Sequence, residues 1–133
     1  MKIIFEDNTS KEKILFENFR KEFSIDPIFL NCDLKISLGG FNKTQSIDIE
    51  LSELKFFLKH LEKFIQDEIP VINFKNLDSI FEISISKSKE EIISVSGKFN
   101  NENHLITLAF NFESNLLYIN QLKSDITFII DSF

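Results

Sequence analysis

The sequence is poor in the residues that build the commonest chemical sites. It contains one cysteine (Cys32), two histidines (His60 and His104) and three glycines among 133 residues. A single cysteine excludes an internal disulfide and a cysteine-built metal site. Three glycines, two of them adjacent at Gly39 and Gly40, exclude a glycine-rich phosphate-binding loop. The HExxH and calcium-loop patterns are absent as well, so the sequence predicts no metal and no cofactor.

Long apolar runs are also missing. No stretch approaches the roughly 18 consecutive apolar residues that a membrane-spanning helix needs. The start of the chain, MKIIFEDN, reaches Glu6 and Asp7 after an apolar run that is too short for the core of a signal peptide. The sequence therefore predicts a cytoplasmic protein that does not span a membrane.

Basic residues are too few for a surface that binds nucleic acid. The chain has 15 Lys and Arg against 21 Asp and Glu, which gives a net charge of −6. Nucleic-acid-binding proteins normally carry a basic patch or stripe, so this balance disfavours that class. It permits a basic protein partner, because opposite electrostatic fields speed encounter. The same charge also serves plain solubility.

Phenylalanine is the abundant residue, with 16 copies and no tryptophan beside them. We interpret these side chains as fillers of a hydrophobic core, and an aromatic binding groove is the alternative. A chain of 133 residues buries roughly two thirds of the surface that its unfolded form exposes. That length fits a single domain over residues 1–133.

The first half of the chain changes from a strand period to a helix period. KIIF and KILFENF are typical of short strands, and Asp26-Pro27 marks a turn. FLNCDLKISL and FNKTQSIDIEL alternate apolar and polar residues around Gly39-Gly40, which predicts a β-hairpin. From Ser52 the apolar residues recur every three or four positions, which predicts a helix capped by Ser52 and ended before Pro70. The residues expected to be buried are Phe41, Ile47, Ile49 and Leu51 in the strand, and Leu54, Phe57, Leu58, Leu61, Phe64 and Ile65 in the helix.

After Pro70 the strand period returns four times, in VINF, SIFEISIS, EIISVSGKF and HLITLAFNF. The polar segments KNLD, KSKE and NNEN predict short connections between these strands. Ser114 is the expected N-cap of a final helix. The apolar residues expected in the last strand and this helix are Ile106, Leu108, Phe110, Phe112, Leu116, Ile119, Leu122, Ile126, Ile129 and Ile130.

These elements together predict an α+β fold. Consecutive strands with short links form an antiparallel meander, here a sheet of about six strands, with two amphipathic helices packed on one face. A hairpin followed by a helix occurs twice, although the sequences of the two halves share too little to establish a repeat.

The sequence contains no recognisable active site. Cys32 alternates with apolar neighbours and is expected to be buried and inert, while a nucleophilic pair with His60 or His104 is the lesser alternative. Asp48 and Glu50 share the polar face of one strand, and a metal or acid–base site there would need a third ligand.

The polar faces of the strands are the candidate binding surface. If helices cover one face of the sheet, the other face is open, and such a face either meets water or serves as a docking surface. Asp48, Glu50 and Glu82 are the candidate partner-binding residues, because strand alternation turns them away from their apolar neighbours.

The order of the parts resembles the bacterial immunity proteins of the WapI type. The matching stretches are NCDLKISLGGF, SELKFFLKHLEKF, ISVSGKF and HLITLAFNFESNLLYINQL, which occur in the same order and with similar spacing. The resemblance covers residues 28–131. It implies a non-enzymatic protein whose partner is a toxin domain, which it binds and neutralises.

A second interpretation belongs to a different class of protein. In this alternative the chain is a small-ligand-binding protein or an enzyme with its pocket between the sheet and the helices. A large toxin gene just upstream of this one would favour the immunity interpretation over this alternative.

Overall fold

The computed structural model describes residues 1–133 except 10, 23–24, 77–79 and 102–106. The first half of the chain forms four strands and a helix: β1 (Lys2–Glu6), β2 (Lys13–Lys21), β3 (Phe29–Leu38), β4 (Phe41–Glu50) and α1 (Leu51–Ile65). The second half repeats that order: β5 (Val71–Lys75), β6 (Phe81–Lys87), β7 (Ile93–Asn100), β8 (Thr107–Ser114) and α2 (Leu116–Ser132). The predicted α+β class is confirmed.

The strands form two antiparallel sheets, where the sequence predicted one sheet of about six strands. The N-terminal sheet has the order β1-β2-β3-β4, and the C-terminal sheet has the order β5-β6-β7-β8. The early segments KIIF and KILFENF join the predicted hairpin and complete the first sheet. Alternation reports which face of a strand is buried, but it does not report which strand lies beside it.

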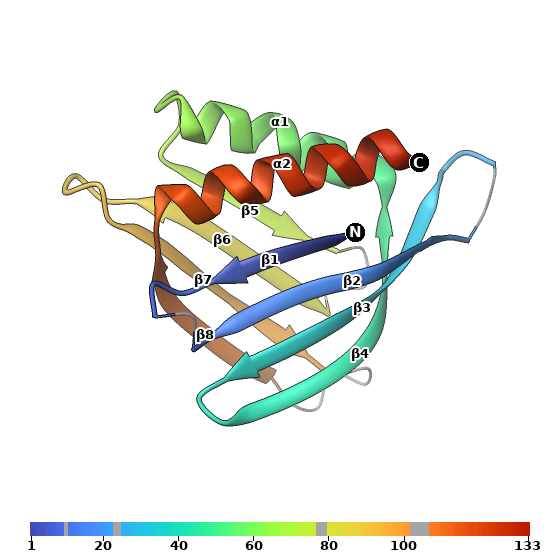
Figure 1. Cartoon of the computed structure of the whole chain (residues 1–133), viewed down its shortest axis with the longest axis horizontal. Helices are drawn as coiled ribbons and strands as arrows, with labels where there is room; N and C mark the ends of the chain where they lie inside the picture. The colour runs from blue at the N-terminus through green and yellow to red at the C-terminus, as the bar shows by residue number, and fades with distance from the viewer. Residues whose placement is uncertain (10, 23–24, 77–79, 102–106) are drawn as a thin grey trace.

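Both helices lie together on one side of the molecule (Figure 1). Each helix packs against the first strand of the other half of the chain, because α2 contacts β1 and α1 contacts β5. The helices also contact each other. None of the helices in the described residues is long and apolar enough to cross a membrane.

One cluster of buried side chains joins both sheets and both helices. Phe16 of the N-terminal sheet meets Phe81 of the C-terminal sheet edge to face, with ring centroids 5.1 Å apart. Phe81 also stacks on Phe110 at 6.2 Å, and Phe57 of α1 meets Phe74 of β5 at 5.4 Å. Such aromatic pairs add about 0.5–1.5 kcal/mol to the free energy gained by burying their area. Most of the phenylalanines therefore fill the core, as the sequence predicted.

The helix caps differ from the prediction by one or two residues. Glu50 is the N-cap of α1, and the Ser52 hydroxyl donates a hydrogen bond of 2.8 Å to the Glu50 carboxylate. Asn115 is the N-cap of α2, where its side-chain oxygen accepts a hydrogen bond of 3.0 Å from the Tyr118 amide. Ser114 instead donates from its hydroxyl to the carbonyl of Glu6, 2.8 Å away, and so ties the end of β8 to β1.

Some residues expected in the core are not fully buried. Phe41 is 42% exposed, because it follows the Gly39-Gly40 turn at the far end of the hairpin. Leu58 and Leu108 are only partly buried, and Leu116 is exposed. Ile106 lies outside the described residues.

The helix face gives a test of the core. Leu61 of α1 has no exposed surface, whereas Leu58 is partly exposed at the edge of the cluster. Leu61→Asp should lower the free energy of unfolding by about 3–5 kcal/mol, because it buries an unpaired charge. Leu58→Asp should cost clearly less, because water reaches its side chain. Urea denaturation of both variants measures the difference, and equal losses would contradict this placement of α1.

Gly97 gives a second test, because the packing of β7 leaves no room for a side chain there. A Cβ at this position would overlap the carbonyl of Glu82 and lie 2.8 Å from Cζ of Phe110. Overpacking of this kind costs about 1–3 kcal/mol. Gly97→Ala should lower the melting temperature, and Ser96→Ala on the same strand should leave it nearly unchanged. A Gly97→Ala variant as stable as the parent would show that the two strands separate easily.

Candidate functional site

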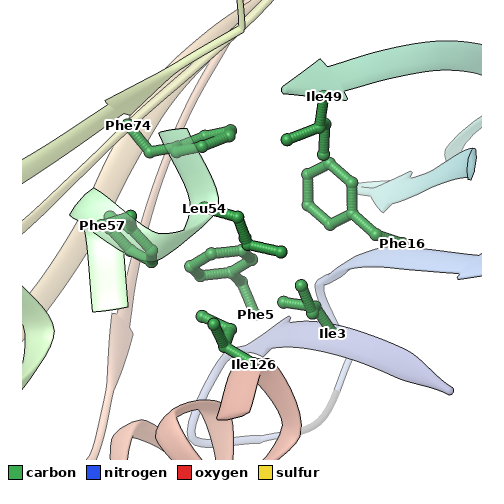
Figure 2. A pocket seen from close by; sticks show the side chains of 8 residues that line it. All are labelled: Ile3, Phe5, Phe16, Ile49, Leu54, Phe57, Phe74 and Ile126. Carbon is green, nitrogen blue, oxygen red and sulfur yellow. The ribbon is translucent and has the colours of Figure 1, made fainter. Parts of the chain in front are cut away.

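The interior contains a small apolar cavity at the centre of the fold. Figure 2 shows side chains from both sheets and both helices pointing toward one another around it. Its volume is about 10 Å³, and its lining residues are Ile3, Phe5, Phe16, Ile49, Leu54, Phe57, Phe74 and Ile126. That space holds about one water molecule, and its lining offers no polar partner to keep a water there. The cavity therefore does not fit a small ligand, whose sites are typically of about 300–1,000 Å³.

The polar face of β4 carries two of the three predicted residues, Asp48 and Glu50. Asp48 Oδ1 accepts a hydrogen bond of 2.9 Å from Asn31 Nδ2 on β3. The same Asn31 amide lies 2.8 Å from the hydroxyl of Ser46. Both acids are partly exposed, and the alternating Ile47 and Ile49 are buried, as the sequence predicted. Asp48 and Glu50 thus lie two positions apart on one surface.

The junction between β4 and α1 adds a third carboxylate. Glu53 in the first turn of α1 accepts a hydrogen bond from the backbone N–H of the N-cap residue Glu50, but the Glu50 side chain makes no cap hydrogen bond in return, so this is only half of a capping box. The other carboxylate oxygen, Oε2, is buried and has no hydrogen-bond partner among the described residues. Burial, and then the neighbouring charge of Glu50, raise the pKa of Glu53 above its ordinary value. This end of α1 therefore has unsatisfied capacity to accept hydrogen bonds or positive charge.

A hollow of about 320 Å³ opens between this end of α1 and strand β5. Glu53 and Phe56 border it on the side of α1, and Asn73 and Lys75 border it on the side of β5. The ring of Phe56 is 62% exposed, and it meets the imidazole of His60 edge to face at 4.2 Å. We call this feature the α1–β5 hollow. It combines an acidic group, an aromatic ring and a lysine within reach of one incoming side chain.

Glu82, the third predicted residue, lies on β6 in the other sheet. Its carboxylate is 3.3 Å from the ammonium of Lys75 and 3.4 Å from that of Lys98. Burial by itself raises the pKa of Glu82, but hydrogen bonds from Lys75 and Lys98 outweigh it and hold this pKa below its ordinary value. The negative charge of Glu82 is therefore already compensated, unlike that of Glu50 or Glu53.

The structure thus brings together part of the predicted set. Asp48 and Glu50 share a surface, and Glu82 reaches the α1–β5 hollow only through its partner Lys75. The prediction missed Glu53 and Phe56. The signals that could have found them were the spacing from Glu50 to Glu53 across a strand-to-helix junction, and a phenylalanine outside the apolar stripe.

The outer face of the C-terminal sheet forms a second, broader hollow of about 620 Å³. Short polar side chains form a row across all four strands, and the cross-strand register places them side by side. The row consists of Asn73, Ser84, Ser96 and Asn111. Short side chains make this face shallow and polar, with Lys75, Glu82 and Lys98 along one border.

The described residues offer little for catalysis. Cys32 is fully buried in β3, and burial and the nearby Asp33 raise the pKa of its thiol to about 12. His60 lies on α1 beside Phe56, and His104 lies outside the described residues. Within the described ranges, no group of three or more His, Cys, Asp or Glu is placed to share a metal ion. A buried thiol with so high a pKa is not a nucleophile near neutral pH.

Comparison with known proteins identifies a family and a solved structure with a similar fold. The model of a family described as the WapI-like immunity protein family matches residues 4–133. No curated protein matches the chain. A solved structure described as "Crystal structures of trypanosoma bruciei MRP1/MRP2" is similar, with a TM-score of 0.52. The match covers 96% of this chain and 80% of that one at 8% sequence identity, which shows a shared fold alone.

The raised pKa of Glu53 predicts a pH-dependent stability. The folded state holds this proton more tightly than the unfolded state, whose pKa is near the ordinary 4.5. That contribution to stability is complete below this value and is lost as the pH rises through the raised pKa. Glu53→Gln keeps an oxygen for the Glu50 N–H and removes the charge. The variant should therefore gain stability relative to the parent as the pH rises from about 4 to 7.

Thermal melts across this pH range test the expectation. Glu68→Gln, which changes an exposed acid just after α1, controls for the loss of one negative charge. A stability difference between Glu53→Gln and the parent that does not change with pH would contradict the role assigned to the buried oxygen.

Proposed function

Because the chain belongs to the WapI-like immunity protein family, we propose that it binds and neutralises a toxin domain by non-covalent association. The family match over residues 4–133 is the observation that carries this proposal. The central cavity is too small and too apolar to be a ligand pocket inside the core, so a ligand site of ordinary size is left only to the α1–β5 hollow and the outer hollow of the C-terminal sheet. The high pKa of the Cys32 thiol also argues against an enzyme built on that residue.

The end of β4 and the α1–β5 hollow form the proposed recognition surface. Asp48 and Glu50 give it negative charge, and Glu53 adds a carboxylate oxygen without a partner in the described structure. Phe56 adds an exposed aromatic ring, a type of side chain that is enriched where proteins bind each other. A lysine or arginine of a basic toxin would pair with the partly exposed carboxylate of Asp48 or Glu50 and contact this ring. The net charge of −6 favours such a partner.

Glu82 has a smaller part in this proposal. Lys75 and Lys98 already compensate its charge, so the surface at Glu82 offers a basic partner less local negative potential than the surface at Asp48 and Glu50. The exposed side of α1 carries Lys55 and Lys59, which repel a basic partner. The proposed partner therefore approaches from the end of β4 and not across the outer side of α1.

The double variant Asp48→Asn with Glu50→Gln tests this surface. Each amide keeps an oxygen to accept the hydrogen bond from Asn31 or Ser52, so the fold should remain intact. We expect slower association with the toxin domain at low salt, because charges at the rim of an interface act mainly on the association rate. The difference should shrink at high salt, where the Debye length falls below about 8 Å. Surface plasmon resonance at two salt concentrations measures it.

A matched control separates position from total charge. Glu68→Gln with Asp131→Asn removes two exposed acids elsewhere, so both double variants have the same net charge. If the control slows association equally, the surface at β4 has no special role. The partner for these experiments is a candidate toxin domain taken from the polypeptide that the adjacent gene encodes. Failure of the parent chain to protect cells that express that domain would refute the immunity function.

A further inference from the structure

The two sheets have four edge strands, which differ in how well they are protected from pairing with another chain. β1 is covered by α2, and β5 is covered by α1. β4 is an edge strand with charged residues at Lys43, Asp48 and Glu50. β8, the last strand of the C-terminal sheet, has the sequence TLAFNF from Thr107 to Phe112, with neither a charged residue nor a proline.

Charges, prolines and covering helices are the usual means by which proteins prevent a strand edge from pairing with another chain. β8 has none of these over six consecutive residues, 107–112. An edge of this kind is a ready template for an added strand. Its length, at roughly 3.3 Å per residue, is that of an ordinary β-strand.

Two hydrogen bonds fix the direction of the backbone groups of β8. The carbonyl of Glu113 accepts a bond of 2.9 Å from the N–H of Asn8, which lies in the turn between β1 and β2. The N–H of Asn100 on β7 donates a bond of 2.7 Å to the carbonyl of Ile80, on the side of β7 away from β8. Asn100 and Glu113 therefore both belong to pairs that are not hydrogen-bonded across the β7–β8 ladder.

In an antiparallel sheet the N–H and C=O of one residue point to the same side, and successive residues alternate. Thr107, Ala109 and Asn111 have the same parity as Glu113, and the register of β7 with β8 is continuous. Their backbone N–H and C=O groups therefore point to the free edge. Among the described residues, none bonds to these groups.

One turn of the protein already contacts this edge. The turn after β1 bonds to Glu113 through Asn8, and the Asn115 side chain donates a hydrogen bond of 2.9 Å to the Asn8 side chain. On β8 this backbone contact involves Glu113 alone. Thr107, Ala109 and Asn111 point to the same edge as Glu113.

We propose that the free edge of β8 binds an extended segment of the toxin domain by strand addition. This inference rests on the proposed immunity function and adds a second contact with the partner to the recognition surface at the end of β4. Main-chain bonds to Thr107, Ala109 and Asn111 supply the attachment, and alternating side chains supply the specificity. The partner of choice is the toxin and not a second copy of this chain, because two copies with a charge of −6 repel each other.

The two faces beside β8 define the chemistry of the added segment. On the inner side, Leu108 is only partly buried, and Phe110 and Phe112 stack at 6.1 Å. On the outer side, Ala109 and Asn111 border the broad polar hollow of the C-terminal sheet. The segment therefore alternates apolar residues, which cover Leu108, with polar residues, which lie beside that hollow.

Residue-resolved amide hydrogen exchange tests the proposal directly. In the free protein, the amides of Thr107, Ala109 and Asn111 should exchange fast, while those of Leu108, Phe110 and Phe112 are held by β7. Addition of the same candidate toxin domain, inactivated, should protect the first three amides. A complex that forms without this protection would overturn strand addition and leave the immunity function standing. The absence of any complex would instead refute the function itself.

A variant gives an independent readout. Ala109→Pro removes an N–H that points away from β7, so the β7–β8 ladder keeps its bonds. It should weaken binding by about tenfold or more, since the added strand loses one bond and meets the proline ring. Ala109→Ser keeps the N–H and should bind like the parent. Equal binding by the Pro and Ser variants would overturn the proposal.

If the Pro variant fails to fold, the exchange experiment on the parent decides. Protection of these amides in the free chain, together with a dimer in solution, would assign the edge to a second copy.

Discussion

The burial of side chains between the inner faces of two separate sheets is the interaction on which the rest of this structure depends. In the described part of the chain the two sheets share no strand pairing, so ladder hydrogen bonds do not connect them. The sheets are held together instead by the contact of Phe16 with Phe81. Two further aromatic contacts extend it, between Phe5 and Phe16 and between Phe81 and Phe110. The small central cavity shows how closely the sheets and helices meet. Because a close-packed interior of this kind has no room for a ligand, we expect the functional residues to lie on the surface.

Much of the fold was predictable, because burial on one face imposes a period on the sequence. The hairpin around Gly39-Gly40, the apolar stripe of α1 and the strands after Pro70 all follow from that rule. The division into two sheets was not predictable, because period two does not identify a neighbour. The predicted burial of Phe41 was wrong for a related reason. Alternation assigned its side chain to the inner face, but the hairpin extends beyond the layer that could cover it.

The candidate site also has parts that the sequence could predict and parts that it could not. Asp48 and Glu50 could be found because they alternate with buried isoleucines on one strand. Glu53 could have been suspected from its spacing to Glu50, but the burial of its oxygen Oε2 without a partner could be seen only in the structure. Glu82 could be identified as outward-facing, but the compensation of its charge depends on the strand register that places Lys75 and Lys98 beside it. A role that depends on a residue's own face is visible in the sequence, whereas one that depends on a neighbouring element requires the structure.

The arrangement of the helices has a consequence for truncated forms of the chain. Each half supplies the helix that shelters the first strand of the other half, so the shelter is reciprocal. A chain that stops before α2 would complete all of its strands, yet it would uncover β1 at the opposite end of the sequence. The damage from an early stop codon would therefore appear at the beginning of the protein. An uncovered β1 would present an exposed strand edge, which can pair with other chains and cause aggregation, even though every residue of β1 is intact.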